Sequence, residues 1–101
     1  MESKQTNAAM GSYQEAIRLD PTLAGPHVNL AAVYNTMGRY ADGLKAAQAG
    51  LKLNPKSAIG HYQLAIAYLK SGDLQRAEAQ QRLLVGLNPE LAKELQRLLQ
   101  N

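Results

Sequence analysis

Few side chains in this sequence are able to perform chemistry, and the histidines are the first to consider. His27 and His61 are the only two, and they lie 34 residues apart. A shared metal ion would require both imidazoles to converge, with further ligands beside them. The sequence contains no cysteine that could complete such a site. We therefore expect the histidines to serve packing, and we expect neither a metal ion nor a cofactor.

The sequence also lacks the combinations of residues that catalyse reactions. No serine, histidine and carboxylate form a recognisable nucleophilic arrangement, and no glycine-rich loop could cradle a phosphate. Asp42, Asp73 and Glu78 are expected to cap helices or to face solvent rather than to act as an acid–base pair. We therefore expect a protein without enzymatic activity.

Composition and charge narrow the remaining functions. Hydrophobic residues make up 46% and charged residues 19% of the chain, which favours a folded domain over a disordered one. The net charge is +3, but the basic residues are spread from Lys4 to Arg97 without forming a block, so we expect no nucleic-acid partner. Residues 1–7 are polar and do not resemble a secretory signal, and no apolar run reaches the roughly 18 residues that span a bilayer. We expect a soluble chain without membrane insertion, with the cytoplasm as the favoured compartment.

These side chains are carried by a sequence that repeats itself every 34 residues. Pro21, Pro55 and Pro89 each follow a Leu-Asp or Leu-Asn pair at this spacing. Residues 24–57 also align with residues 58–91 without a gap, as expected of a repeat architecture. The further matches are Ala24 with Ala58, His27 with His61, Leu30 with Leu64, Ala31 with Ala65, Tyr34 with Tyr68, and Gly38 with Gly72.

Each repeat is expected to form a pair of helices. Apolar residues recur at steps of three and four, Gly38 and Gly72 are suited to end a helix, and Asp73 is placed to cap the next one. The predicted helices are residues 5–19, 24–37, 40–53, 58–71, 74–87 and 90–100. One helix pair cannot bury both of its faces alone, so the fold class is all-α, a short α-solenoid.

The predicted domain covers residues 1–101. It begins with half a repeat that supplies only a second helix, residues 1–23, and continues with full repeats at 24–57 and 58–91. A C-terminal capping helix, residues 90–101, completes it. Gly43 and Gly50 fall inside the helix 40–53, where each costs about 1 kcal/mol relative to alanine. We expect these glycines to allow close helix packing and this helix to be the softest element.

A helix–turn–helix unit of 34 residues with these landmarks resembles the tetratricopeptide repeat. The positions that match the family pattern are His27, Leu30, Ala31, Tyr34, Gly43, Ala47 and Pro55 in one unit, and His61, Leu64, Ala65, Tyr68, Ala77, Gln81 and Pro89 in the other. The sequence departs from the family at the aromatic position of the second helix, which holds Ala47 or Gln81; only the leading half repeat keeps it, as Tyr13. The resemblance implies a right-handed superhelix whose first helices line a concave groove.

The resemblance also implies which residues would line that groove. Carried over position by position, they are Val28, Asn29, Ala32, Ile59, Tyr62, Gln63, Ile66, Leu69 and Lys70. Asn29 and Gln63 occupy equivalent places, and their amides could pair with the backbone of an extended peptide. The carboxylate clamp of one subclass is not expected, because Ile59 and Gln63 stand where it needs lysine and arginine. The expected function is a non-catalytic adaptor that binds a protein or peptide.

An alternative function is a structural module that stacks end to end. The chain begins with a second helix and ends with a first helix, so each end could supply what the other lacks. The expected contact joins Leu95, Leu98 and Leu99 of one copy to Met10, Tyr13 and Ile17 of the next. Such a contact would make a homo-oligomer that grows unless its geometry closes.

Overall fold

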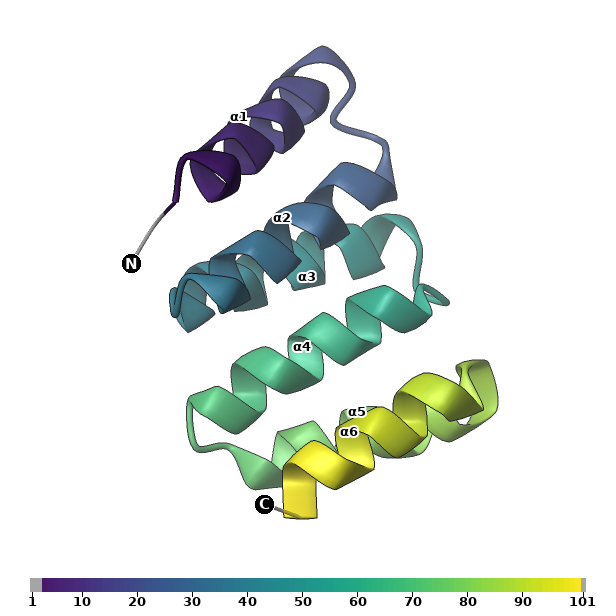
Figure 1. Ribbon diagram of the computed structural model, residues 1–101. Coiled ribbons are helices and arrows are strands. Elements are labelled where there is room, and N and C mark those ends of the chain that lie inside the picture. The colour runs from purple at the N-terminus through teal and green to yellow at the C-terminus, as the bar shows by residue number, and fades with distance from the viewer. Residues whose placement is uncertain (1–2, 101) are drawn as a thin grey trace.

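The computed structural model describes residues 3–100 and shows six α-helices and no strand within that range (Figure 1). The helices are α1 (Lys4–Leu19), α2 (Ala24–Thr36), α3 (Tyr40–Leu53), α4 (Ala58–Lys70), α5 (Leu74–Leu87) and α6 (Pro89–Gln100). Every boundary lies within one residue of its prediction, and the all-α fold is confirmed. Residues 1, 2 and 101, which belong to the predicted domain, lie outside the described residues.

The helix ends follow from local sequence. Gly38 and Gly72 have φ angles of 80° and 87°, the left-handed conformation that favours glycine after a helix. Asp73 caps α5 as predicted, since its carboxylate accepts a hydrogen bond from the backbone N–H of Arg76 at 3.1 Å. Asn88 caps α6 in the same manner. These caps stop each helix where the next must turn back.

The helices stack as a solenoid with two layers. In Figure 1, α2, α4 and α6 lie side by side as one layer, and α3 and α5 lie behind them. Helix α1 packs on α2 at one end, and α6 packs on α4 and α5 at the other. Each first helix is therefore held on one face by its own partner and on another by the neighbouring pair, which leaves a third face open.

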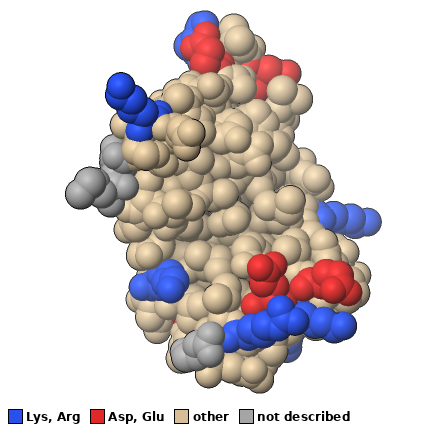
Figure 2. All heavy atoms as spheres, in the orientation of Figure 1, with Lys and Arg blue, Asp and Glu red and all other residues tan. Residues whose placement is uncertain are grey.

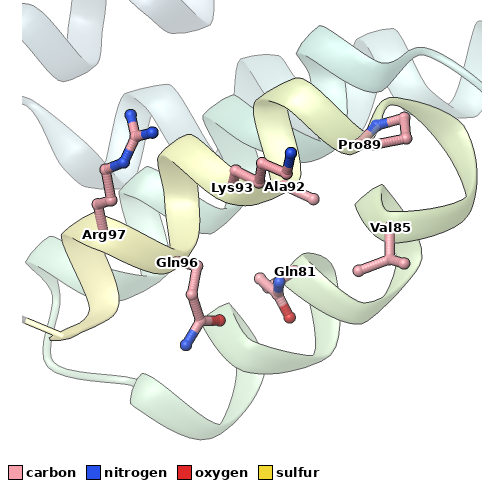
Figure 3. Close-up of a pocket in the computed structure, with 7 residues that line it drawn as sticks. All are labelled: Gln81, Val85, Pro89, Ala92, Lys93, Gln96 and Arg97. Carbon is pink, nitrogen blue, oxygen red and sulfur yellow. The ribbon is translucent and has the colours of Figure 1, made fainter.

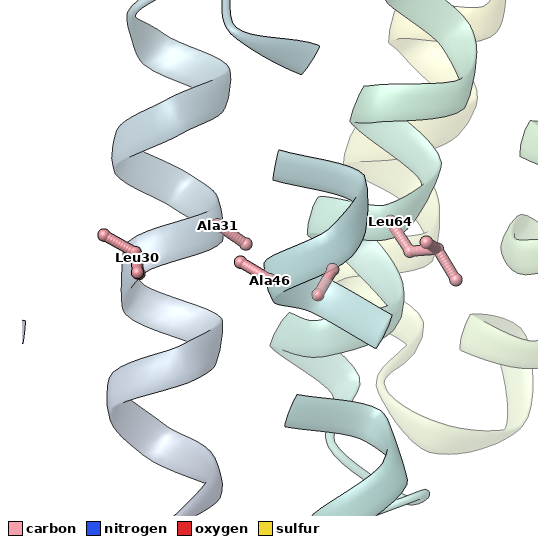
Figure 4. Close-up of a cluster of buried hydrophobic side chains, with 5 residues drawn as sticks. Leu30, Ala31, Ala46 and Leu64 are labelled. Carbon is pink, nitrogen blue, oxygen red and sulfur yellow. The ribbon is translucent and has the colours of Figure 1, made fainter. Parts of the chain in front are cut away.

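The interior is built largely from alanine and leucine. The first core cluster lies between α2, α3 and α4 (Figure 4), and its buried members are Leu30, Ala31, Ala46, Ala47 and Leu64. The second lies between α4, α5 and α6, and its buried members are Ala65, Leu84, Ala92 and Leu95. Small alanine side chains let the helix axes approach closely, so large aromatic rings are not needed to fill the space.

Helix α3 approaches α2 most closely at its two glycines. A Cβ atom built on Gly43 would lie 2.1 Å from Oδ1 of Asn35, and one built on Gly50 would lie 2.6 Å from Cγ2 of Val28. Real Cβ atoms do not approach other atoms so closely. The predicted close packing at these glycines is confirmed, whereas the softness of this helix remains a prediction.

The residues of the predicted end-to-end contact are used inside the chain. Met10, Tyr13 and Ile17 of α1 pack against the first core cluster. On α6, Leu95 is 0% exposed, Leu99 packs against the second cluster and Leu98 is half-buried. The prediction that these side chains form free end surfaces is wrong, because a helix with one apolar stripe turns that stripe toward its own domain.

Candidate functional site

The open face of the first-helix layer contains a hollow between α2 and α4. Its volume is about 250 Å³, and it is lined by Ala32, Asn35, Thr36, Tyr40, Tyr62, Gln63, Ile66 and Lys70. Five of these belong to the predicted groove: Ala32, Tyr62, Gln63, Ile66 and Lys70. We call this hollow the α2–α4 hollow.

A second hollow continues the same face toward α1. It has a volume of about 320 Å³ and is lined by Ser3, Gln5, Thr6, Ala9, Tyr13, Asn29, Ala32, Val33 and Thr36. Ala32 and Thr36 belong to both hollows, so the open surface runs without a break across α1, α2 and α4. The contribution of α1 was not expected, because the groove residues were carried over only from the first helices of the two full repeats.

The remaining predicted groove residues lie differently. Val28 is only 5% exposed and packs against α3 at Gly50, so it offers a partner little surface, and its place in the groove is corrected to a supporting one. Ile59 is 54% exposed, and together with Asn29 it lines a third hollow at the N-terminal ends of α2 and α4. Leu69 is half-buried near the end of α4.

A buried amide joins the two repeats beneath the α2–α4 hollow. The Nδ2 atom of Asn35 donates hydrogen bonds to the main-chain oxygen and to Oε1 of Gln63, both at 3.0 Å. Asn35 is 7% exposed and was not a predicted groove residue, because the equivalent position in the next repeat is Leu69 and the repeat gave no signal there. Gln63 therefore does not act like Asn29, since its oxygen is already engaged and only its amide N–H groups remain for a partner.

The two hollows are nearly free of charge. Lys70 is the single ionisable cation among the residues that line them. Burial, and then the nearby carboxylate of Glu94, raise the pKa of the Tyr62 phenol, so this ring stays neutral and partly shielded by α6. Figure 2 shows the same face as largely uncharged over α2 and α4, with both signs of charge gathered toward the α6 end. The hollows thus suit an extended segment that is mainly neutral.

Both histidines serve the turns between repeats. The Nε2 atom of His61 lies 2.8 Å from the main-chain oxygen of Pro55, and that of His27 lies 3.3 Å from the oxygen of Pro21. The same contact in each repeat confirms their packing role. Within residues 3–100 no group of three or more His, Asp or Glu side chains could hold a metal ion, and none of the described helices is long and apolar enough to cross a membrane.

Comparison with known proteins agrees with this geometry. A sequence profile described as a tetratricopeptide repeat matches residues 29–92, and another described as a TPR repeat matches residues 1–38. A tetratricopeptide repeat and J domain-containing co-chaperone of Cryptococcus neoformans is 35% identical over 92% of this chain and 18% of its own length. A small glutamine-rich tetratricopeptide repeat-containing protein of Saccharomyces cerevisiae is 29% identical over 83% of this chain and 25% of its own length. The chain thus spans about a quarter or less of these relatives.

Two solved structures share the fold. The TPR domain of Arabidopsis OM64 superposes with a TM-score of 0.88 at 23% identity, covering 96% of this chain and 82% of that one. The Yersinia enterocolitica type III secretion translocator chaperone SycD superposes with a TM-score of 0.83 at 22% identity, covering 95% and 70%. At these identities the likeness concerns the arrangement of the helices.

Proposed function

We propose that this chain, which belongs to the tetratricopeptide repeat family, is a non-catalytic adaptor that binds a segment of a partner protein across its open concave face. The printed names of its relatives support a role in protein interaction, since one is a co-chaperone and one structural neighbour is a secretion chaperone. The observation that carries the proposal is the unbroken surface across α1, α2 and α4.

The chemistry of this surface suits an extended peptide. Tyr62 and Ile66 offer apolar area on one side of the α2–α4 hollow, where an apolar side chain of the partner would lie. The free amide N–H groups of Gln63 and the exposed amide of Asn29 would pair with peptide groups of its backbone. Lys70, at the C-terminal end of α4, would favour a carboxylate at that end of the segment.

A test of this site requires a change that blocks the surface without damaging the core. Tyr62 and Ile66 also pack against the second core cluster, so truncating them would weaken the fold as well as the site. Ala32 is a better position, because it lines both hollows and a long side chain there would fill them. Ala41→Arg on exposed α3 is a matched control, since it adds the same side chain outside both hollows.

Peptides selected from a random display library against the whole chain would serve as ligands. We expect Ala32→Arg to weaken their binding by about tenfold or more, as blocking the centre of an interface does, and Ala41→Arg to leave it within about twofold. Affinity would be measured by titration calorimetry, with circular dichroism to verify that both variants fold. Equal affinities for the two variants would refute the concave site.

A further inference from the structure

The end of the solenoid formed by α5 and α6 carries a separate groove. Figure 3 shows it between the two helices, with Gln81 and Val85 on α5 facing Ala92 and Gln96 on α6. Its volume is about 480 Å³. Val85 is 55% exposed although it is apolar, and Ala92, 3% exposed, forms the floor. None of these residues belongs to the concave hollows.

The preceding repeat shows what usually covers these positions. Ala47 and Leu51 of α3 are equivalent to Gln81 and Val85, one repeat earlier. Ala47 is 0% exposed, and Leu51 packs against α4, where a Cβ on Gly60 would lie 2.9 Å from its Cδ2 atom. Inside the solenoid, this side of a second helix is therefore closed by another helix. At α5 it is left open, so the groove has the form of a seat for a helix.

Two cations stand along this groove. Lys93 and Arg97 lie one turn apart on α6, both line the groove and both are exposed (Figure 3). In the part of the chain that the structure describes, ion pairs involve Arg18, Arg39 and Arg76, and none involves either of these two residues. An apolar floor with two cations beside it is complementary to a helix that carries an apolar stripe flanked by carboxylates.

We propose that the α5–α6 groove binds an acidic amphipathic helix of a partner protein, independently of the concave site. A second copy of this chain is a poor occupant. The chain is itself basic, with a net charge of +3, and its own terminal helix α1 carries Lys4 and Arg18 against the single carboxylate of Glu15. A segment bound in the concave hollows would leave the groove free, so one molecule could hold two partner segments at once.

A peptide copied from this chain provides a probe with known packing. Helix α5, of 14 residues, packs on α4 through Ala77 and Leu84, so its apolar stripe already fits a first helix of this fold. The acidic probe is the α5 peptide with Arg76→Glu and Arg82→Glu, which makes all three of its charged side chains carboxylates. The unchanged α5 peptide, with two arginines and one glutamate, is the matched control.

Fluorescence anisotropy of the labelled peptides would measure binding to the complete chain. We expect the acidic probe to bind at least about tenfold more tightly than the unchanged peptide, and Lys93→Glu with Arg97→Glu to remove that preference. Lys45→Glu with Lys52→Glu alters the net charge equally at exposed positions of α3 and should change affinity by less than about threefold.

The outcomes separate this site from its alternatives. No binding of the acidic probe would overturn the proposal, as would equal losses in the two charge-reversal variants, which would indicate unspecific attraction. A loss caused by Ala32→Arg would place the probe in the concave hollows and would also overturn it. Loss confined to the Lys93 and Arg97 variant, with circular dichroism unchanged, supports it whether or not the concave site binds peptides.

Discussion

Replacing Gly43 by alanine should destabilise the chain, against the ordinary preference of helices for alanine. In an open helix this change contributes about 1 kcal/mol of stability. At Gly43, however, the new Cβ would lie 2.1 Å from Oδ1 and 2.9 Å from Cγ of Asn35. Asn35 is 7% exposed and cannot move away without losing its two hydrogen bonds to Gln63.

The expected magnitude follows from the two ways of relieving this overlap. Breaking both hydrogen bonds costs about 2 kcal/mol, and keeping them by straining the helix pair costs about 1–3 kcal/mol. Subtracting the helical preference of about 1 kcal/mol leaves a net loss of about 1–2 kcal/mol in the free energy of unfolding. Urea titration followed by circular dichroism at the helical band would measure it.

The decisive comparison is the same change without the amide. In an Asn35→Ala background the obstructing atoms are gone, so Gly43→Ala should become stabilising by up to about 1 kcal/mol. Gly11→Ala is the control for helical preference alone, because nothing lies within 4 Å of its added Cβ. If Gly43→Ala stabilises the otherwise unchanged chain as Gly11→Ala does, the assigned packing of α2 against α3 is incorrect.

Three further changes test other parts of the structure by the same titration. Gly38→Ala forces a Cβ into a φ of 80° and should cost about 1–2 kcal/mol, with Gly38→Asn less damaging; equal midpoints would contradict the turn. Hydrogen bonds from the Arg76 backbone and guanidinium lower the pKa of the Asp73 carboxyl, so its contribution to stability is complete above its unfolded pKa of about 3.9 and is lost as the pH falls through the lower folded value. Asp73→Ala should therefore lower the urea midpoint near neutral pH, and the deficit should vanish in acid. Leu95→Ala, at 0% exposure, should cost about 2–5 kcal/mol, while Leu83→Ala, at 51% exposure, should cost less than about 1 kcal/mol.

The parts of this protein that depend on neighbouring residues along the chain could be predicted from sequence. The helices, the left-handed turn at Gly38 and the cap at Asp73 are local features, and the 34-residue period repeated their signals until each boundary was set within one residue. The close approach at Gly43 and Gly50 was predictable for a related reason. Glycine inside a helix is costly, and its presence there indicates a tight contact.

Which neighbour each helix face meets was decided only by the tertiary structure. A periodic pattern shows that a helix has an apolar side, but not whether that side turns toward its own domain or toward another molecule; Leu95 is buried within the chain for this reason. The bond from Asn35 to Gln63 joins residues 28 positions apart and has no counterpart in the other repeat, so no periodicity could reveal it. The unbroken surface across α1, α2 and α4 likewise arises from how the helices stack, because side chains from separate helices become neighbours only after the solenoid has formed.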